Sequence, residues 1–312
     1  MRPALSVVVF TTLAGAGQGV FLTVYFSGLV ALLPGASDLP VDFAVAGAAL
    51  AAVLAAIGLA ASFFHLGHPE RAWRAAAMWR TSWLSREVIA LPVFIGACGA
   101  YAIALHQGMS AAPWLGALAF IACLALFICT AMIYICLKFL QEWASPLTLL
   151  NFVLLGCASG CTLAVPLALL HAPQWTGALC AASVVLTLLA LVSRAASLAR
   201  NARLRPKSTL QSAIGIANPR VRQISMGFTA GSFNTREFFH GASPRKLFAV
   251  KWSFLLLAFV TPVILIAAGA LTGSPLPFYF AFPIQYLGLL AERWYFFAQA
   301  NHPQNIYYQA IA

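Results

Sequence analysis

Long apolar stretches with at most one charged residue dominate the sequence. Such runs, most of them close to the roughly 20 residues that cross a bilayer as a helix, lie at residues 4–33, 43–64, 88–105, 113–137, 146–170, 175–192, 248–271 and 278–291. The last run reaches about residue 298 if Glu292 and Arg293 lie at the membrane interface. None of the runs alternates between apolar and polar positions, which argues against the strands of a membrane barrel. The pattern therefore predicts eight membrane-spanning helices.

The predicted fold class is all-α, with residues 1–312 forming one membrane-anchor domain built as a bundle of eight helices. Only helices and closed barrels satisfy the backbone hydrogen bonds in hydrocarbon. The first run is longer than the core of a signal peptide, about 7–15 residues, and no cleavage site with small residues follows a short apolar core. We therefore expect residues 1–33 to be retained as a helix.

Composition and charge place this bundle in a membrane and orient it. Hydrophobic residues make up 62% of the chain and charged residues 8%, against roughly 25% charged in soluble domains. All 18 Lys and Arg residues fall in the N-terminus, the C-terminus or every second connection, and none falls near 34–42, 106–112, 171–174 or 272–277. The positive-inside rule then predicts both termini on the cytoplasmic side of a bacterial inner membrane. The net charge of +11 is explained by Lys and Arg side chains that set the topology and contact lipid head groups. Nucleic acid is therefore not an expected partner.

The longest segment between apolar runs extends over residues 198–247. It is rich in Arg, Ser, Asn and Gly and contains Phe228, Phe233, Phe238 and Phe239, which argue against disorder. A loop of this length is usually functional or disordered, and it is too short for an independent domain with its own core. We interpret it as a cytoplasmic docking segment for a soluble partner.

The cysteine pattern gives no support for a metal site or a disulfide. All seven cysteines lie within the predicted spans and no CxxC pair occurs, so an iron–sulfur or zinc site is not expected. Cys157 and Cys161 share a helix face, which does not allow a disulfide within one helix. We expect all seven to be small buried side chains.

The GAGQG stretch at Gly15–Gly19 superficially resembles a dinucleotide-binding loop. It lacks the preceding strand and the third glycine of that motif. Gly15 and Gly19 instead form a GxxxG face, which is typical of closely packed membrane helices.

A haem-binding cytochrome and a transporter are the competing membrane classes. His106 and His171 end the third and fifth predicted spans on one face, so a haem between them is conceivable, although neither lies well within a span. Pro92, Pro166 and Pro262 hint at the broken helices of transporters, but the predicted spans carry no charge at their centres. Both classes are less favoured than a membrane protein whose functional site lies at its basic face.

The richest chemistry lies in residues 63–88, between the second and third spans. His65 closes span two and Glu87 opens span three, so two antiparallel helices bring them to one face of the membrane. Trp73, Trp79 and Trp83 can form an interfacial belt beside them. A quinone needs a hydrogen-bonding group and a proton carrier, which histidine and carboxylate supply. The alternative is an interfacial histidine and a Glu87 paired with Arg86 or Arg71.

The chain resembles the eight-helix anchor subunit of dimethyl sulfoxide reductase-type molybdoenzymes. The resemblance covers essentially the whole length and rests on H-L-G-x-P-x-R-A at residues 65–72, S-x-L-S-x-E at 82–87 and AERWYFF at 291–297. It implies an anchor without haem or metal that exchanges electrons between menaquinol or ubiquinol and an iron–sulfur subunit, which serves a molybdopterin catalytic subunit. It also implies quinone-site roles for His65 and Glu87.

Arg71 and Arg86 flank these two positions and complete the candidate quinone site, with Glu292 and Tyr295 on span eight as secondary candidates. The basic face around residues 65–72, Arg86 in place of the usual Asn, and residues 232–241 and 292–308 are more similar to the anchors of cytoplasmic sulfite dehydrogenases. The resemblance therefore implies sulfite:quinone oxidoreduction. The alternative is an anchor for a dimethyl sulfoxide or related S- or N-oxide reductase that oxidises menaquinol.

Overall fold

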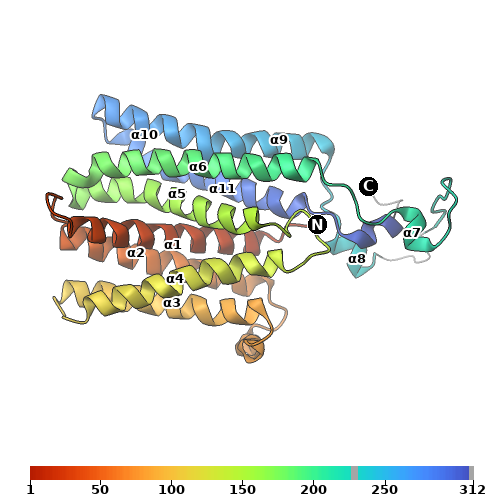
Figure 1. Cartoon of the computed structure of the whole chain (residues 1–312), viewed down its shortest axis with the longest axis horizontal. Coiled ribbons are helices and arrows are strands. Elements are labelled where there is room, and N and C mark those ends of the chain that lie inside the picture. Colours follow the sequence, from red (N-terminus) through yellow and green to blue (C-terminus); the bar gives the residue numbers. More distant parts are fainter. Residues whose placement is uncertain (226–230, 309–312) are drawn as a thin grey trace.

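The computed structural model describes residues 1–225 and 231–308, apart from the side chain of His65. Every regular element in this part of the chain is helical, which confirms the all-α fold class. Phe228 and the other residues of the gap lie outside the described part. Figure 1 shows long helices running side by side, with a smaller group of short helices beyond one end.

The long helices agree with the apolar runs of the sequence. They are α1 (Leu5–Ala31), α2 (Val41–Ser62), α3 (Trp83–His106), α4 (Ala112–Ile135), α5 (Pro146–His171), α6 (Thr176–Ala202), α9 (Pro244–Leu255), α10 (Thr261–Thr272) and α11 (Leu276–Ala298). The π-helix η4 (Leu256–Val260) joins α9 and α10 into one segment, and the short helix η3 (Pro173–Trp175) precedes α6. In the described residues seven segments are long and apolar enough to cross a membrane, and α11 is the eighth long segment.

The sequence placed the end of the sixth span too early. Helix α6 continues to Ala202, ten residues beyond the predicted end at 192, whereas α11 ends at Ala298, the longer of the two limits given by the sequence. The side chains of Glu292 and Arg293 are both buried inside the bundle. The ends of α6 and α11 therefore bring charged residues into the protein interior.

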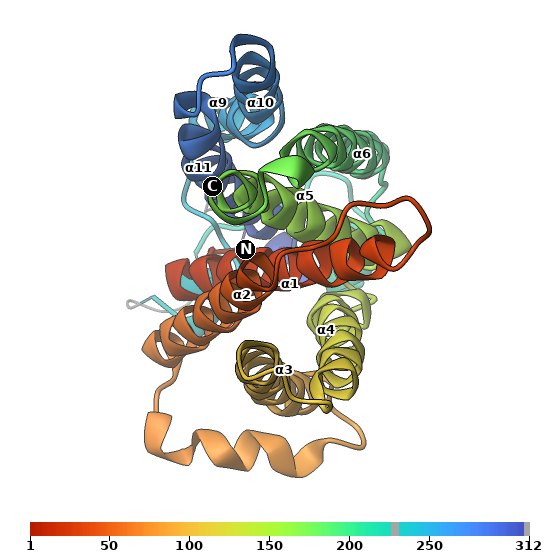
Figure 2. The ribbon, with the colours of Figure 1, turned by 90° about the vertical axis from the view of Figure 1, so that its left-hand side faces the viewer.

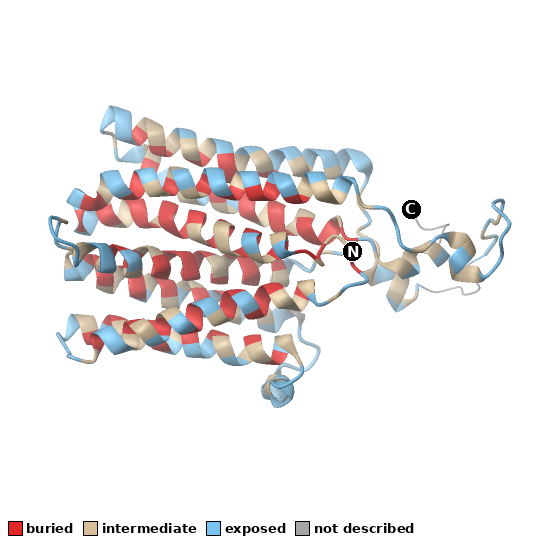
Figure 3. Cartoon of the chain, in the orientation of Figure 1, coloured by how far each residue is buried: buried red, intermediate tan, exposed pale blue. Residues whose placement is uncertain are grey.

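Helix α1 lies at the centre of the bundle and packs against α2, α4, α5 and α11. Figure 2 shows it crossing between the α2–α3–α4 group and the α5–α6–α11 group. Figure 3 shows buried residues concentrated on α1 and α5, and exposed residues on the outer faces. Exposed apolar residues such as Ile57, Ile121 and Val192 suit a surface covered by lipid.

The GxxxG face of α1 is confirmed as a close helix contact. Gly15 and Gly19 lie against Gly156 and Gly160 of α5, and a Cβ atom built on Gly19 would overlap the Gly156 carbonyl. Side chains of ordinary size would force the two backbones apart. Glycine therefore sets the distance between the central helices.

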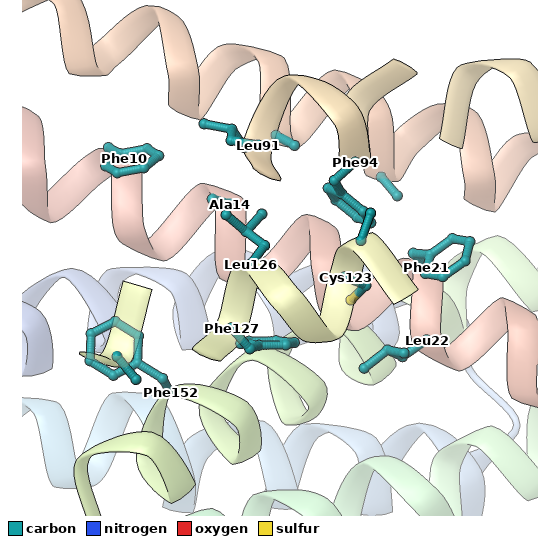
Figure 4. Close-up of a cluster of buried hydrophobic side chains, with 14 of the residues drawn as sticks. Phe10, Ala14, Phe21, Leu22, Leu91, Phe94, Cys123, Leu126, Phe127 and Phe152 are labelled. Atoms are coloured by element: carbon teal, nitrogen blue, oxygen red, sulfur yellow. The ribbon is translucent and has the colours of Figure 1, made fainter. Parts of the chain in front are cut away.

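Around this contact the core is built from aromatic and small residues. Phe21, Phe94 and Tyr101 meet edge to face, with Phe21 and Phe94 fully buried. Figure 4 shows Phe10, Leu91, Leu126, Phe127 and Phe152 filling the space between α1, α3, α4 and α5. Close packing of this kind, rather than hydrophobic burial from water, holds helices together in lipid.

A proline explains the π-helix in the segment α9–α10. Pro262 has no N–H to donate to the carbonyl of Ala258, four residues earlier. The side-chain amide of Gln285 donates to that carbonyl instead, at 3.3 Å. Helix α11 thus satisfies the hydrogen-bonding group that the proline leaves free.

The connections alternate between two ends of the bundle. The basic ones, with the N-terminus and the short helices, lie at the end shown on the right of Figure 1, here called the basic end. None of the 18 Lys and Arg residues lies in the connections at the opposite end. The segregation of charge predicted from the sequence is therefore a feature of the fold.

Beyond the basic end lies a small structured region, here called the cap, formed by residues 203–225, 231–243 and 299–308. It contains α7 (Leu210–Ile214), α8 (Phe233–Glu237) and η5 (Pro303–Tyr307). The rings of Phe238 and His302 stack at 3.8 Å, and Tyr307 donates a hydrogen bond to the Ala213 carbonyl. Burial lowers the pKa of His302, and the nearby N-terminal amine lowers it further. Helices α6 and α9 take up the two ends of the predicted segment 198–247.

All seven cysteines carry free thiols. The prediction that all of them are buried is wrong for Cys136, which is exposed because α4 ends at Ile135 and leaves it in the following connection. Cys157 is partly buried, and the remaining five are buried.

Candidate functional site

Glu87 lies in the second turn of α3, close to the basic end. The Ser82 side chain caps α3 by accepting from the Ser85 N–H, which fixes the start of the helix at Trp83. Glu87 is only 5% exposed, and the Thr130 hydroxyl of α4 donates a short hydrogen bond to its Oε1 atom. A buried carboxyl group with few hydrogen-bond partners is a candidate proton donor or acceptor.

The two candidate arginines stay away from Glu87. Arg86 donates to the carbonyls of Trp79 and Arg80, each at 2.8 Å, and stacks over the Trp83 ring. Arg71 lies 3.6 Å from Glu70 and is largely exposed. Among the described residues neither arginine forms an ion pair with Glu87, so Arg86 instead fastens the preceding loop to the start of α3.

His65 ends the short helix η1 (Phe63–His65), which directly follows α2. Helices α2 and α3 pack against each other, so their adjacent ends belong to one region of the basic end. The side chain of His65 lies outside the described part of the structure. That His65 and Glu87 face one pocket stays a prediction.

The helix η2 (Pro69–Met78) follows and crosses the outside of the bundle (Figure 2). Its Trp73 ring is 71% exposed and lies beside the guanidinium of Arg74. Trp79 and Arg80 form a similar pair just after η2. This arrangement of exposed tryptophan and arginine suits the boundary between lipid and water, as the predicted aromatic belt requires.

Glu292 of α11 forms a buried charge cluster with Arg194 of α6 and Arg293. Its Oε1 atom lies 2.7 Å from Arg194 Nε, and its Oε2 atom lies 3.9 Å from Arg293 Nε. The contact between Arg194 and Glu292 is an ion pair by distance. It is not a hydrogen bond, since within the described chain the Arg194 N–H at Nε does not point at an acceptor. All three side chains are at least 95% buried. Burying charges is costly, so such a cluster is a candidate functional site.

Aromatic faces hold the two arginines of the cluster. The Arg293 guanidinium lies 3.8 Å from the centre of the Phe152 ring, and the Arg194 guanidinium lies 5.5 Å from that of Phe254. Cation–π contacts of this kind replace part of the lost hydration. They keep both positive charges close to Glu292.

A small cavity separates this cluster from the hydrogen bond between Thr130 and Glu87. Its volume is about 20 Å³, which gives room for one water molecule. Thr130, Glu292 and Arg293 all line it, together with the polar α1 residues Thr11, Thr12 and Gln18. The Tyr134 hydroxyl, one turn after Thr130, lies within electrostatic range of both Glu87 and Arg293. Glu87 and Glu292 thus belong to one polar region.

Tyr295 lines a second hollow, one helix turn closer to the basic end than Glu292. This vestibule has a volume of about 190 Å³ and is also lined by Glu142, Leu198, Lys251, Gln299 and Asn301. Several of these lining residues are polar, so the vestibule can be filled by water from the basic end.

The two histidines considered for haem lie at the end opposite to Glu87. Both His106 and His171 are exposed, at the last residues of α3 and α5. This placement suits solvated histidines at the membrane surface. In the described residues no group of three or more His, Cys, Asp or Glu side chains is arranged to hold a metal ion.

Thr130 and Arg194 were not predicted from the sequence. Arg194 was placed at the start of a basic loop, although a polar stripe of Ser183, Thr187, Arg194 and Ser197 recurs at helical spacing and pointed inward along α6. Thr130 gave no comparable signal, because a single threonine in an apolar run usually bonds to its own helix.

These features define a helical membrane protein with a buried network of titratable groups near its basic end. The family model described as DMSO reductase anchor subunit (DmsC) matches residues 1–272. The chain belongs to this family of membrane anchor subunits. It is also 49% identical to a sulfite dehydrogenase subunit, designated C, of Allochromatium vinosum, over 336 aligned positions that cover 100% of both chains. No solved structure matches it.

Proposed function

We propose that the chain is the quinone-reactive anchor of a molybdopterin enzyme complex that couples sulfite oxidation to quinone reduction. The observation that carries this proposal is Glu87, a buried carboxyl group with a hydroxyl partner at the start of a membrane helix. The family supports an anchor role, and the 49% identity to a sulfite dehydrogenase subunit supports sulfite as the substrate of the complex.

In this proposal the chain positions the quinone and moves its protons. Quinone becomes quinol by taking two electrons and two protons. The electrons come from an iron–sulfur subunit, which obtains them from the molybdopterin subunit, and Glu87 supplies one proton while His65 bonds to the quinone ring. The site must open between helices near the basic end, because Glu87 is only 5% exposed.

The proposed topology is eight spans with both termini in the cytoplasm of a bacterium. Helix α11 supplies the eighth span, and its buried Gln285, Glu292 and Arg293 explain why it is less apolar than the others. The basic end then faces the cytoplasm, where the positive-inside rule expects it.

The iron–sulfur partner is proposed to dock on the cap. A groove of about 410 Å³ lies there between Phe139, Arg205, Lys207 and Asn305, among others. A partner bound in this groove would lie on the same side as Glu87. Electrons could then pass between the partner and a quinone without crossing the bilayer.

A reductase anchor that oxidises menaquinol is the second candidate. The description of the matching family model names DMSO reductase. His65 and Glu87 could serve either direction of electron flow. The position of the basic end distinguishes the two, because the sulfite arrangement requires the partner in the cytoplasm.

Replacing Glu87 by Gln in the assembled complex tests the quinone site. The amide keeps the shape and a bond to Thr130 but cannot transfer a proton, so sulfite:quinone turnover should fall by roughly 100-fold or more. Sulfite oxidation with ferricyanide, a soluble acceptor, should stay normal. Unchanged quinone-linked turnover would place the site elsewhere, and an equal loss with ferricyanide would point to a role in assembly.

A further inference from the structure

The charge cluster of Glu292, Arg194 and Arg293 contains more polar groups than packing between two helices needs. Atoms Glu292 Oε2 and Arg293 Nε make no aligned hydrogen bond within the described chain, although both are buried. Both residues line the cavity of about 20 Å³. Buried polar atoms without a partner, at the wall of a cavity with room for one water molecule, are the usual surroundings of an ordered water.

We propose that Glu292 is a proton-relay residue that connects the vestibule at the basic end with Glu87 through this cavity. The proposal rests on the proposed quinone chemistry of Glu87 and adds the route by which that group regains its proton. Glu292 is a positioning and relay residue in this proposal, because it does not touch the quinone.

The inner half of the route runs from Glu292 to Glu87. A water in the cavity can contact Glu292 and Thr130, which both line it, and the Thr130 hydroxyl already donates to Glu87. Thr130 can pass a proton by accepting one from the water as it releases its own. Tyr134, within electrostatic range of Glu87 and Arg293, is the other titratable group that faces this part of the route.

The outer half of the route runs from Glu292 to the vestibule. Tyr295 lies three residues after Glu292 on α11, and Leu198 lies four residues after Arg194 on α6, so both are on the same helix faces as the cluster. Both residues line the vestibule of about 190 Å³. The distance along the helices from the charge cluster to the vestibule is therefore about one helix turn, roughly 5.4 Å. Glu142 and Lys251 are the charged groups that line the vestibule.

The charges permit transfer in both directions. The Glu292 carboxylate faces two guanidinium groups, those of Arg194 and Arg293. Together with an ionised Glu87, these charges sum to zero. A proton on either carboxyl group adds one positive charge, which the two arginines oppose. They thereby favour release of the proton to the quinone. Each transfer forms one O–H bond and breaks another, and the electrons come from the iron–sulfur subunit.

The test compares Glu292→Gln with Gln285→Met in the complete complex. Gln285 is a buried polar residue on the same helix that the route does not include. Glu292→Gln should lower kcat for decylubiquinone by roughly tenfold or more. It should leave the KM for quinone and the ferricyanide reaction unchanged, and it should increase the solvent deuterium isotope effect. Gln285→Met should change none of these.

Two further variants separate the relay from a structural role. Glu292→Asp keeps a titratable carboxyl group and should retain much of the turnover, whereas Glu292→Ala should regain turnover when formate, a small weak acid, is added. Loss of both effects, or a Glu292→Gln enzyme that behaves like Gln285→Met, would overturn the relay. In that case an impaired Glu87→Gln enzyme would leave the proposed quinone site standing, and a normal one would remove both proposals.

Discussion

At the scale of single residues, the buried cluster of Arg194, Glu292 and Arg293 could not be predicted from charge alone. The sequence placed Arg194 at the start of a loop and Glu292 at an interface, because charged residues near the end of an apolar run usually lie there. The fold overrides this rule by extending α6 and α11 toward the basic end. Glu87 was the easier residue to recognise, since it lies in a motif with a family resemblance, although its partner Thr130 was not foreseen.

The pair of Arg194 and Glu292 should behave as a buried ion pair in stability measurements. Replacing Arg194 by Met leaves the Glu292 carboxylate without its closest positive partner, 2.7 Å away, and should cost about 3–5 kcal/mol. The triple variant Arg194→Met, Glu292→Met and Arg293→Met removes the burial cost of all three charges and should recover most of this loss.

Thermal unfolding of the purified complex in detergent, followed by fluorescence, measures both variants. The triple variant should unfold well above Arg194→Met alone. Equal unfolding temperatures for the single and triple variants would show that Glu292 does not depend on Arg194 for its burial.

At the scale of helices, apolar runs predicted the order of the spans but could not predict how far helices continue into polar sequence. Residues 193–202 look like loop sequence, yet they extend α6 because Ser193 and Ser197 bond with Asn151 of α5. The GxxxG motif was more informative. Two glycines four residues apart on one membrane helix are typical of close approach by a second helix.

Gly19 should tolerate even one methyl group poorly. A Cβ atom there would overlap the Gly156 carbonyl, so Gly19→Ala should destabilise the bundle by about 1–3 kcal/mol through forced separation of α1 and α5. Gly28 of the same helix is the matched control, because its added Cβ would meet only the Leu39 side chain at 3.9 Å.

Alanine at position 28 should be neutral or slightly stabilising, since alanine is the better helix former. Unfolding temperatures of the two variants in the same detergent give the comparison. Similar values for Gly19→Ala and Gly28→Ala would mean that α1 and α5 can move apart without loss.

At the scale of the whole molecule, the one-sided distribution of Lys and Arg links topology to function. The same end carries the cap, the vestibule and Glu87, so a partner on the cap would lie close to the proposed quinone site. This arrangement was predictable in outline, because the alternation of basic and uncharged connections is visible in the sequence. The shape of the cap was not, because its contacts join residues 203–225 and 231–243 to the distant segment 299–308.

Cysteine labelling can test the orientation and the docking surface together. Replacing the exposed Cys136 by Ser lowers the background, since the other six cysteines are buried or partly buried. Single cysteines are then placed at exposed positions, Arg236→Cys in the cap and Gln107→Cys at the opposite end. An impermeant maleimide should label position 107 in intact spheroplasts and position 236 only after permeabilisation, as the positive-inside rule requires.

The partner subunits supply the second comparison. In permeabilised cells that produce the anchor alone, Arg236→Cys should react faster than in cells that produce the full complex, while Gln107→Cys should react equally in both. Labelling of position 236 in intact spheroplasts would reverse the orientation and favour the menaquinol-oxidising reductase. Equal rates with and without the partners would move the docking surface away from α8, because an occupied cap must shield the thiol from a reagent in the water.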